Sequence, residues 1–469
     1  MNLARHHFPP VRSLVAALWE RRRRPQTAAT ATALLLLAAT LRAQPAPPPV
    51  PDKLDLQTAI TFALENNFAI LQAKERIRQQ EGIMIEVKAR SIPNAAITSS
   101  LSKIDRGLAA VPLPQIPVNT KSWNIALNVS QALYAGGGIR SAVKSSQLAR
   151  DAALLDLENV INEALLQVRT AFFSVLLARE QINVQESNLQ LLQEQLKTAT
   201  DRYEAGTVSS FEKLRAEVAF ANAKVPLITA RNNYRLAIEA MRQSLGFTTN
   251  TPESLQKVPE FVGTLDFTPV NFDLPAAFEA AHAHRPDLQR LAKITAVREQ
   301  DVRTQRSGYY PNIGAVAGYQ FKNSPYAPNQ FNEALDGWTL GLQGNWAIFD
   351  GRATAGRVAQ SKSILAQTKL TLAEAQLAVD VEVRRAFSQW QQASELVDAS
   401  QKVVAQATEA VRLANARYNA GTSTQLDVLQ AQTDLTTART NQIQAFYNYN
   451  VAVAALRKAT GQADEFIKR

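Results

Sequence analysis

The sequence predicts an internally duplicated α+β membrane protein, in which each chain supplies four membrane-spanning β-strands and several very long helices. A set of short motifs recurs about 215 residues later in the chain. Each half also combines two segments of alternating hydrophobicity with a helical pattern of more than 60 residues. The 469 residues include no Cys and only four His. We therefore expect no disulfide, no thiolate catalysis, no bound metal and no cofactor.

Residues 1–43 have the pattern of a secretory signal peptide. Arg21–Arg24 form a positive region, a small and apolar run follows from Ala28 to Leu41, and Ala43 is a small residue at the cleavage point. The apolar run is shorter than the roughly 20 residues that a spanning helix needs, so a cleaved signal is favoured over a membrane anchor. Residues 44–53 form a Pro-rich linker.

The net charge of +10 would at first suggest a nucleic-acid partner. The signal segment, however, holds seven Arg against one Glu, which leaves 44 basic and 40 acidic residues in the rest of the chain. No basic patch or nucleic-acid motif follows, so we expect no nucleic-acid partner.

The rest of the chain consists of two copies of one unit. Arg202–Thr207 recurs as Arg417–Thr422 at an offset of 215, and Pro93-Asn94 recurs as Pro311-Asn312 at an offset of 218. The three-residue difference places an insertion or deletion in one loop, where such changes are tolerated. The predicted boundaries are 54–246 for the first repeat, 247–271 for a linker, 272–461 for the second repeat and 462–469 for a C-terminal tail.

A very long helix is predicted in each repeat, from about Ile139 to Tyr203 and from about Ala353 to Tyr418. Apolar residues recur there at steps of three and four, which indicates coiled-coil-like packing. Such a helix would be roughly 98 Å long, too long for a compact globule. Gly206 and Gly421 then supply tight turns into a last helix. The remaining helices are expected at about 56–91, 211–245, 274–308 and 426–459.

Two hairpins, 94–131 and 312–347, show strict alternation of apolar and polar residues, which predicts strands. One face is apolar and carries Trp123, Trp338 and Trp346 near its ends, and the other is small and polar. That pattern is typical of barrel strands with lipid outside and water inside. A soluble hairpin with one buried face is the alternative. The signal peptide, the flanking aromatics and the lack of a helix pattern to cover the face favour the membrane.

Four strands cannot close a membrane barrel, because the smallest barrels have about eight. An open strand edge in lipid would leave backbone groups unpaired at several kcal/mol each. The chain must therefore combine its strands with those of other copies. Two, three or four copies would give 8, 12 or 16 strands, and the strand count alone does not choose among them.

The order of elements, the duplication and several motifs together resemble the outer-membrane efflux protein (TolC-like) family. The resemblance spans roughly Lys53 to Gly461. The motifs that carry it are Ala63–Asn67, the Pro-Asn strand entries at 93–94 and 311–312, Gln131–Gly137, the two Arg-Tyr-x-Ala-Gly-Thr turns, and Leu426–Ala431. No single motif is specific; their order and duplication are.

The resemblance implies a homotrimer, with 12 strands in an outer-membrane barrel and 12 helices continuing it as a periplasmic α-helical barrel. The linker and the chain ends would form an equatorial collar. It implies a passive exit duct, not an enzyme, that serves tripartite efflux or type I secretion. Its partners would be outer-membrane lipid, a periplasmic adaptor and an inner-membrane pump. The alternative is a periplasmic coiled-coil adaptor or scaffold, which would carry one helical hairpin and a lipoyl-like β domain.

The resemblance also places candidate functional residues at the turns between the long helices, which it implies form the periplasmic mouth. The residues expected to meet the adaptor are Arg202, Tyr203, Gly206, Thr207, Arg417, Gly421 and Thr422. Asp427 matches a position where the family often has a pore-facing carboxylate. Gln430 stands where a second carboxylate is sometimes found, Glu212 is the repeat equivalent of Asp427, and Tyr418 completes the gate candidates. Pore lining and stabilisation of the helix start are equally compatible with Asp427 and Glu212.

Overall fold

The computed structural model describes residues 52–105, 121–247, 258–323 and 334–462. The predicted signal peptide and almost all of the Pro-rich linker lie outside the described residues. So do the middle parts of both strand-connecting loops, residues 248–257 of the predicted linker and residues 463–469 of the predicted tail.

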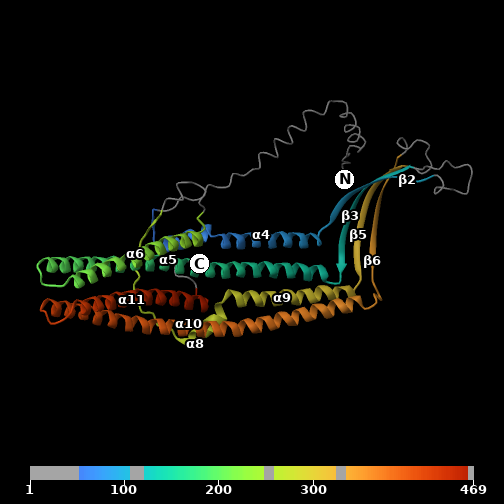
Figure 1. Cartoon of the computed structure of the whole chain (residues 1–469). Coiled ribbons are helices and arrows are strands. Elements are labelled where there is room, and N and C mark those ends of the chain that lie inside the picture. Colours follow the sequence, from blue (N-terminus) through green and yellow to red (C-terminus); the bar gives the residue numbers. More distant parts are fainter. Residues whose placement is uncertain (1–51, 106–120, 248–257, 324–333, 463–469) are drawn as a thin grey trace, which may run out of the picture. The chain divides into compact units, whose positions relative to one another are not determined.

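The two repeats have the same order of elements (Figure 1). The first contains α3 (Leu56–Asn66), α4 (Phe68–Ala89), β2 (Asn94–Lys103), β3 (Lys121–Ala135), α5 (Gly138–Glu204) and α6 (Ser210–Leu245). The second contains α8 (Leu274–His284), α9 (Pro286–Arg306), the 3-10 turn η2 (Ser307–Tyr309), β5 (Asn312–Asn323), β6 (Ala334–Asn345), α10 (Ala353–Asn419) and α11 (Gln425–Ala459). A short parallel pair joins β1 (Lys53–Leu54) to β4 (Glu260–Phe261). The 67-residue helices α5 and α10 confirm the two long helical patterns.

The first helical stretch of each repeat is divided in two, where one continuous stretch is predicted. Asn67 has an extended backbone, and its side chain accepts from the N–H groups of Ala69 and Ile70, so it ends α3 and caps α4. In the second repeat, Arg285 precedes Pro286, which disfavours helical geometry at Arg285 and begins α9 at its first position. Both breaks have local sequence signals.

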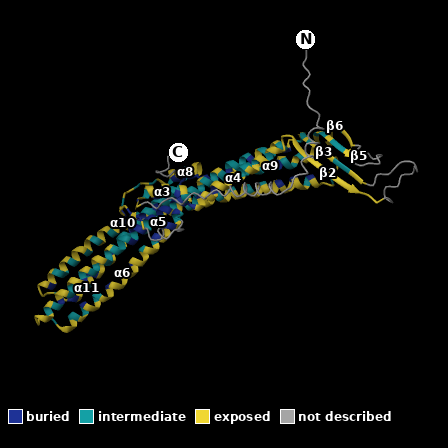
Figure 2. Cartoon of the chain, turned by 90° about the horizontal axis from the view of Figure 1, so that it is seen from above, coloured by how far each residue is buried: buried dark blue, intermediate teal, exposed yellow. Residues whose placement is uncertain are grey.

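The main core lies where the short helices meet the middle of the long ones. In the first repeat, the buried cluster joins Ile60 of α3, Val168 and Phe172 of α5 and Leu245 of α6, with Phe261 of the linker added. Buried residues gather in this part of the chain and thin out toward the helix turns (Figure 2). One 18-residue window of α5 is apolar enough to cross a membrane by composition, with a mean hydropathy of 1.4. The core residues of α5, such as Val168 and Phe172, account for this apolar stretch.

The four long strands form one antiparallel sheet in the order β2-β3-β5-β6. The register aligns Ile97, Leu127, Tyr319 and Trp338 in one row across all four strands. The next row is Thr98, Ala126, Gln320 and Gly337. Because neighbouring rows point to opposite faces, one face is apolar and the other is small and polar. Within the described residues, the outer edges of β2 and β6 have no paired strand.

Candidate functional site

The apolar face of the sheet is the first candidate functional surface. Its large side chains are mostly exposed, and five of them are at least 74% exposed: Ile97, Leu101, Trp338, Leu340 and Leu342. A contiguous apolar surface of this kind marks contact with another protein or with a membrane.

Aromatic residues bracket this apolar face at both ends. Near the ends of the strands that lead into the connecting loops, Tyr319 and Phe321 form an edge-to-face pair with ring centroids 5.1 Å apart, and Trp338 lies opposite Tyr319. At the helix end, the indole N–H of Trp346 donates to the carbonyl of Tyr309 at 3.1 Å. Trp338 and Trp346 are eight residues apart, roughly 27 Å of extended chain. At the tilt of about 35–45° that barrel strands have, this length rises roughly 20 Å, which is most of the apolar band of about 25 Å between the aromatic girdles of membrane barrels.

Small polar groups on the opposite face bond to one another across strands. The amide of Asn128 donates to the Thr98 hydroxyl at 3.1 Å, and the hydroxyls of Ser102 and Ser122 lie 2.6 Å apart. A sheet with one apolar and one hydrated face can therefore separate lipid from water.

The turns between the long helices, hereafter the tips, are the second candidate surface. Gly206 and Gly421 have positive φ angles of 73° and 72°, as the sequence predicts for such turns. The N–H of Thr207 donates to the carbonyl of Arg202 at 2.9 Å, and that of Thr422 does the same to Arg417. The two tips therefore have the same backbone closure.

Asp427 takes part in a complete capping box at the start of α11. Its Oδ2 accepts from the backbone N–H of Thr424 at 2.9 Å and from the Ser423 hydroxyl at 2.6 Å, and its own N–H donates to the Thr424 hydroxyl. The Ser423 and Thr424 hydrogen bonds hold the pKa of Asp427 below its usual value. The carboxylate is nevertheless exposed. Asp427 thus caps its helix and also presents charge to the solvent.

The other gate candidates have different surroundings. The N–H of Glu212 donates to the Ser209 hydroxyl at 3.4 Å, which is one half of a capping box. The amide of Gln430 donates to Asp434 Oδ1 at 2.9 Å on the exposed side of α11. Tyr418 is only 9% exposed, because another side chain covers its ring.

That covering group is Arg202 from the tip of the first repeat. Its guanidinium carbon lies 4.7 Å from the centre of the Tyr418 ring, and its Nη2 donates to Asn419 Oδ1 at 3.1 Å. The two tips of one chain therefore touch. Sequence reasoning did not find this contact, because both copies carry the same Arg-Tyr pair and nothing local shows which Arg meets which Tyr.

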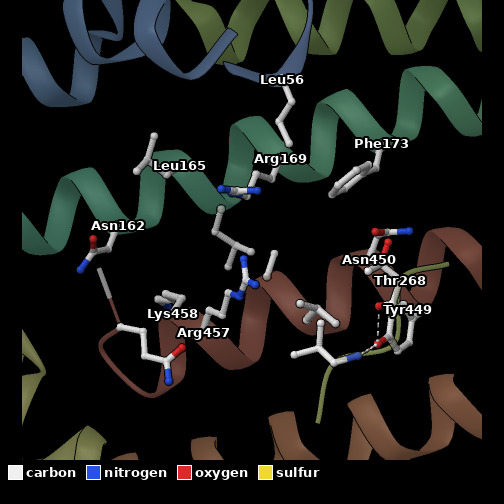
Figure 3. Close-up of a pocket in the computed structure, with 15 residues that line it drawn as sticks. Leu56, Asn162, Leu165, Arg169, Phe173, Thr268, Tyr449, Asn450, Arg457 and Lys458 are labelled. Carbon is white, nitrogen blue, oxygen red and sulfur yellow. Dashed lines mark hydrogen bonds between the residues drawn. The ribbon is translucent and has the colours of Figure 1, made fainter. Parts of the chain in front are cut away.

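A cavity of about 330 Å³ lies between α5, α11 and the linker segment around Thr268 (Figure 3). Arg169 on α5 and Arg457 and Lys458 on α11 line it. Lys458 pairs with Glu163 at 2.9 Å and with Glu382 at 3.5 Å. Burial alone would lower the pKa of Lys458, but its carboxylate partners outweigh burial and raise it. Throughout the described ranges, no group of three or more His, Asp and Glu side chains could hold a metal ion.

The Tyr449 hydroxyl forms two hydrogen bonds to the linker beside this cavity. It donates to the carbonyl of Thr268 at 3.0 Å and accepts from the N–H of Val270 at 2.9 Å (Figure 3). We interpret the cavity as a gap that remains where the linker packs against the long helices.

Comparison with known proteins identifies relatives of the whole fold. The family described as outer membrane efflux protein matches residues 59–247 and 277–462. The chain is 26% identical over 412 residues to outer membrane efflux protein BepC of Brucella suis biovar 1 (strain 1330), covering 87% of this chain and 85% of BepC. It is 26% identical over 310 residues to outer membrane protein TolC of Escherichia coli (strain K12), covering 64% and 62% of the two chains. The crystal structure of the Campylobacter jejuni CmeC outer membrane channel shares the fold, with a TM-score of 0.76, 17% identity and coverage of 88% and 87%.

Proposed function

The chain belongs to the outer membrane efflux protein family, and on this premise we propose that it is an outer-membrane exit duct of a tripartite efflux or type I secretion system. It resides in the outer membrane, and its helices extend into the periplasm. Neither the family description nor the relatives' names denote an enzyme, so we propose no catalytic activity.

The observation that carries this proposal is the two-faced sheet. The row of Ile97, Leu127, Tyr319 and Trp338 has no cover in the described chain, whereas the opposite face bonds through Thr98, Asn128 and Ser102. Lipid would remove the apolar face from water at a gain of roughly 25 cal/mol per Å². The polar face is suited to a water-filled pore.

The unpaired outer edges of β2 and β6 support strand pairing between copies, and the family resemblance supports three copies. Each unpaired backbone group on an edge in lipid costs several kcal/mol, so the edge of one copy pairs with that of the next. In the proposed trimer, 12 strands close the barrel. The four helices α5, α6, α10 and α11 of each copy continue it as a periplasmic helical barrel.

The tips form the periplasmic mouth and meet the adaptor, which in turn engages an inner-membrane pump. The proposed adaptor contacts are Arg202, Tyr203, Gly206, Thr207, Arg417, Gly421 and Thr422. At the gate, the lowered pKa of Asp427 keeps its carboxylate ionised, so three copies would present a negative ring near Gln430 and Glu212. Tyr418 belongs to this gate through its contact with Arg202.

The alternative of an adaptor or scaffold protein is not favoured. Two long helical hairpins, α5–α6 and α10–α11, are present together with a four-stranded sheet whose apolar face is open. An adaptor would need only one such hairpin, and it would have no use for lipid-facing strands.

Spin labels on neighbouring strand positions test the proposal. The chain has no native Cys, so Leu342→Cys and Gln343→Cys can each be labelled singly. In membranes, the label at 342 should be accessible to oxygen and shielded from a water-soluble relaxation agent, and the label at 343 should show the reverse. Native mass spectrometry should report three copies. Water exposure at both positions, or a monomer in the membrane-extracted protein, would overturn the proposed duct.

A further inference from the structure

A groove lies where the helices meet the sheet, between the end of β3, the start of α5 and the last turns of α9 (Figure 1). Its volume is about 970 Å³, within the range of ligand-binding pockets. Three of its lining residues are cationic, namely Arg140, Lys144 and Arg303, and the described residues that line it include no Asp or Glu. Positive charge is therefore concentrated at the boundary between the helices and the sheet.

The three cations of the groove form no ion pair with another described residue. Farther from the sheet, by contrast, Arg298 of α9 pairs with Asp301 at 3.0 Å. Arg140 stands in the first turn of α5, where the helix dipole disfavours positive charge, and Lys144 follows it at the i,i+4 spacing at which like charges repel. An anion in the groove would offset both effects.

The repeated backbone does not require these cations. At the offset of 215, the repeat equivalents of Arg140 and Lys144 are Ala355 and Ala359. At the offset of 218, the equivalent of Arg303 is Ile85. The same helices form with neutral side chains at the matched positions, so helix formation and packing do not explain the three charges.

The groove continues the apolar face of the sheet. Tyr134, which lines it, pairs with Ile313, and Ile313 lies on the same face as Ala315, whose partner is Leu342. A β-bulge directly before Tyr134 leaves Leu133 as the extra residue. Leu133 also lines the groove and is 59% exposed. The groove thus adjoins the surface that we assign to lipid, at the end of the strands where the helices begin.

We propose that this groove binds the headgroup of an anionic phospholipid from the leaflet that faces the periplasm. The phosphate lies among Arg140, Lys144 and Arg303, because the planar guanidinium groups offer paired donors to phosphate oxygens and Lys144 adds a point charge. The acyl chains run past Leu133 and Tyr134 onto the apolar face. An aromatic ring beside cations is typical of the headgroup level of membranes. The inference rests on the proposed function and adds a specific lipid site to it.

Lipid retention by the solubilised protein tests the site. Full-length protein in detergent is titrated with phosphatidylglycerol, and native mass spectrometry reports the copy number and the bound lipid in one spectrum. Arg140→Gln and Lys144→Gln should each weaken binding by about fivefold, the effect of one cation near an anionic lipid. The matched control is Arg357→Gln at the start of α10, where the cation pairs with Asp350 at 3.8 Å, and it should leave binding unchanged.

Two results of this titration would overturn the site. One is equal binding of phosphatidylglycerol by the wild-type protein and by the double variant Arg140→Gln/Lys144→Gln. The other is displacement of the lipid by inorganic phosphate at equal concentration, which would make free phosphate the ligand. Retention of the lipid in the presence of phosphate, together with its loss in the double variant, supports the phospholipid.

A matched pair of fluorescent labels locates the lipid. Ser141 lines the groove, and its repeat equivalent Gly356 has open space around it on α10. Each position is changed to Cys in a separate variant, labelled with bimane and placed in nanodiscs that contain phosphatidylglycerol with a nitroxide near its headgroup. Quenching should be stronger at 141 than at 356, and it should be equal at the two when phosphatidylcholine carries the nitroxide. No preference for phosphatidylglycerol at 141 would contradict the site.

These outcomes are separate from those of the proposed duct. If the label at 342 reports lipid and three copies are present, but the double variant binds phosphatidylglycerol as the wild type does, the lipid site is wrong and the duct stands. If the label at 342 reports water, the apolar face does not meet lipid, and the proposed duct fails together with the site.

Discussion

In the first repeat, Asn67 holds the break between the two short helices, whereas Arg285 occupies the same place in the second. The Asn67 amide donates to the carbonyl of Ser244 at 2.7 Å, and Arg285 Nη1 donates to the carbonyl of Ala459 at 3.2 Å. Ser244 and Ala459 are themselves repeat equivalents. Arg285 also bonds to both carboxylate oxygens of Asp287 and to Glu382 at 2.7 Å.

The same backbone break is therefore stabilised by different contacts in the two repeats. Among the described residues, the buried cluster around the first break has 14 members, including Phe261 and Leu265 from the linker, and the cluster around the second has eight. The first break can rely on apolar burial with a single amide. The second relies more on a buried guanidinium that joins α9, α10 and α11.

The largest expected effect is the loss of Arg285. Arg285→Ala leaves Asp287 without its partner in a partly buried site and leaves Glu382 with Lys458 alone, so the free energy of unfolding should fall by about 3–5 kcal/mol. The matched change Asn67→Ala removes neutral hydrogen bonds and should cost about 1–3 kcal/mol. Denaturant unfolding in detergent micelles, followed by circular dichroism, measures both. Equal losses would contradict the contrast between the repeats.

A second contrast lies between the faces of the sheet. Leu342→Arg puts a charge on the apolar face midway between Trp338 and Trp346, and should cost ~2–4 kcal/mol in a bilayer. Gln343→Arg, one residue along on the polar face, should cost far less. Urea unfolding in phospholipid vesicles gives both values. Similar costs at the two positions would mean that the apolar face does not meet lipid.

The helix starts behind the tips form a third contrast. Thr424→Ala removes the N-cap of a complete capping box, and Ser209→Ala removes half of one, so the first change should be the larger within a range of about 0.5–2 kcal/mol. Amide hydrogen exchange in the first turns of α11 and α6 measures the local opening. Faster exchange only in α6 would contradict the assignment of the box to Asp427.

The smallest effect is a dependence on pH at Asp287 in the second repeat. Burial would raise the pKa of Asp287, but the hydrogen bond and charge of Arg285 outweigh burial and lower it. Its stabilisation is complete above the unfolded value of about 3.9 and is lost as pH falls through the lower folded value. In Arg285→Ala, burial is opposed only by the backbone N–H groups of Leu288 and Asp287, so protonation of Asp287 should move to higher pH. Carboxyl chemical shifts over an acid titration measure this, and an unchanged midpoint would contradict it.

Local patterns in the sequence determined the duplication, the long helices, the strands and the glycine turns. The period-two alternation of Leu340 and Leu342, or the Gly at 206 and 421, depends on each residue's own neighbours. The breaks at Asn67 and before Pro286 also have local signals, although one continuous helix is predicted at each place. The family resemblance drawn from these motifs is confirmed. The trimer, the adaptor and the gate residues remain proposals.

Only the tertiary structure decided which residues of the two Arg-Tyr-x-Ala-Gly-Thr motifs contact each other. Arg202 and Arg417 stand in the same sequence pattern, yet Arg202 covers Tyr418 and Arg417 is exposed. The choice depends on contacts more than 200 residues apart, such as Arg202 with Asn419. One chain with two repeats has one internal junction and two outer sides. The burial of each tip residue therefore follows from which side of its repeat faces the rest of the chain, and no local pattern contains that information.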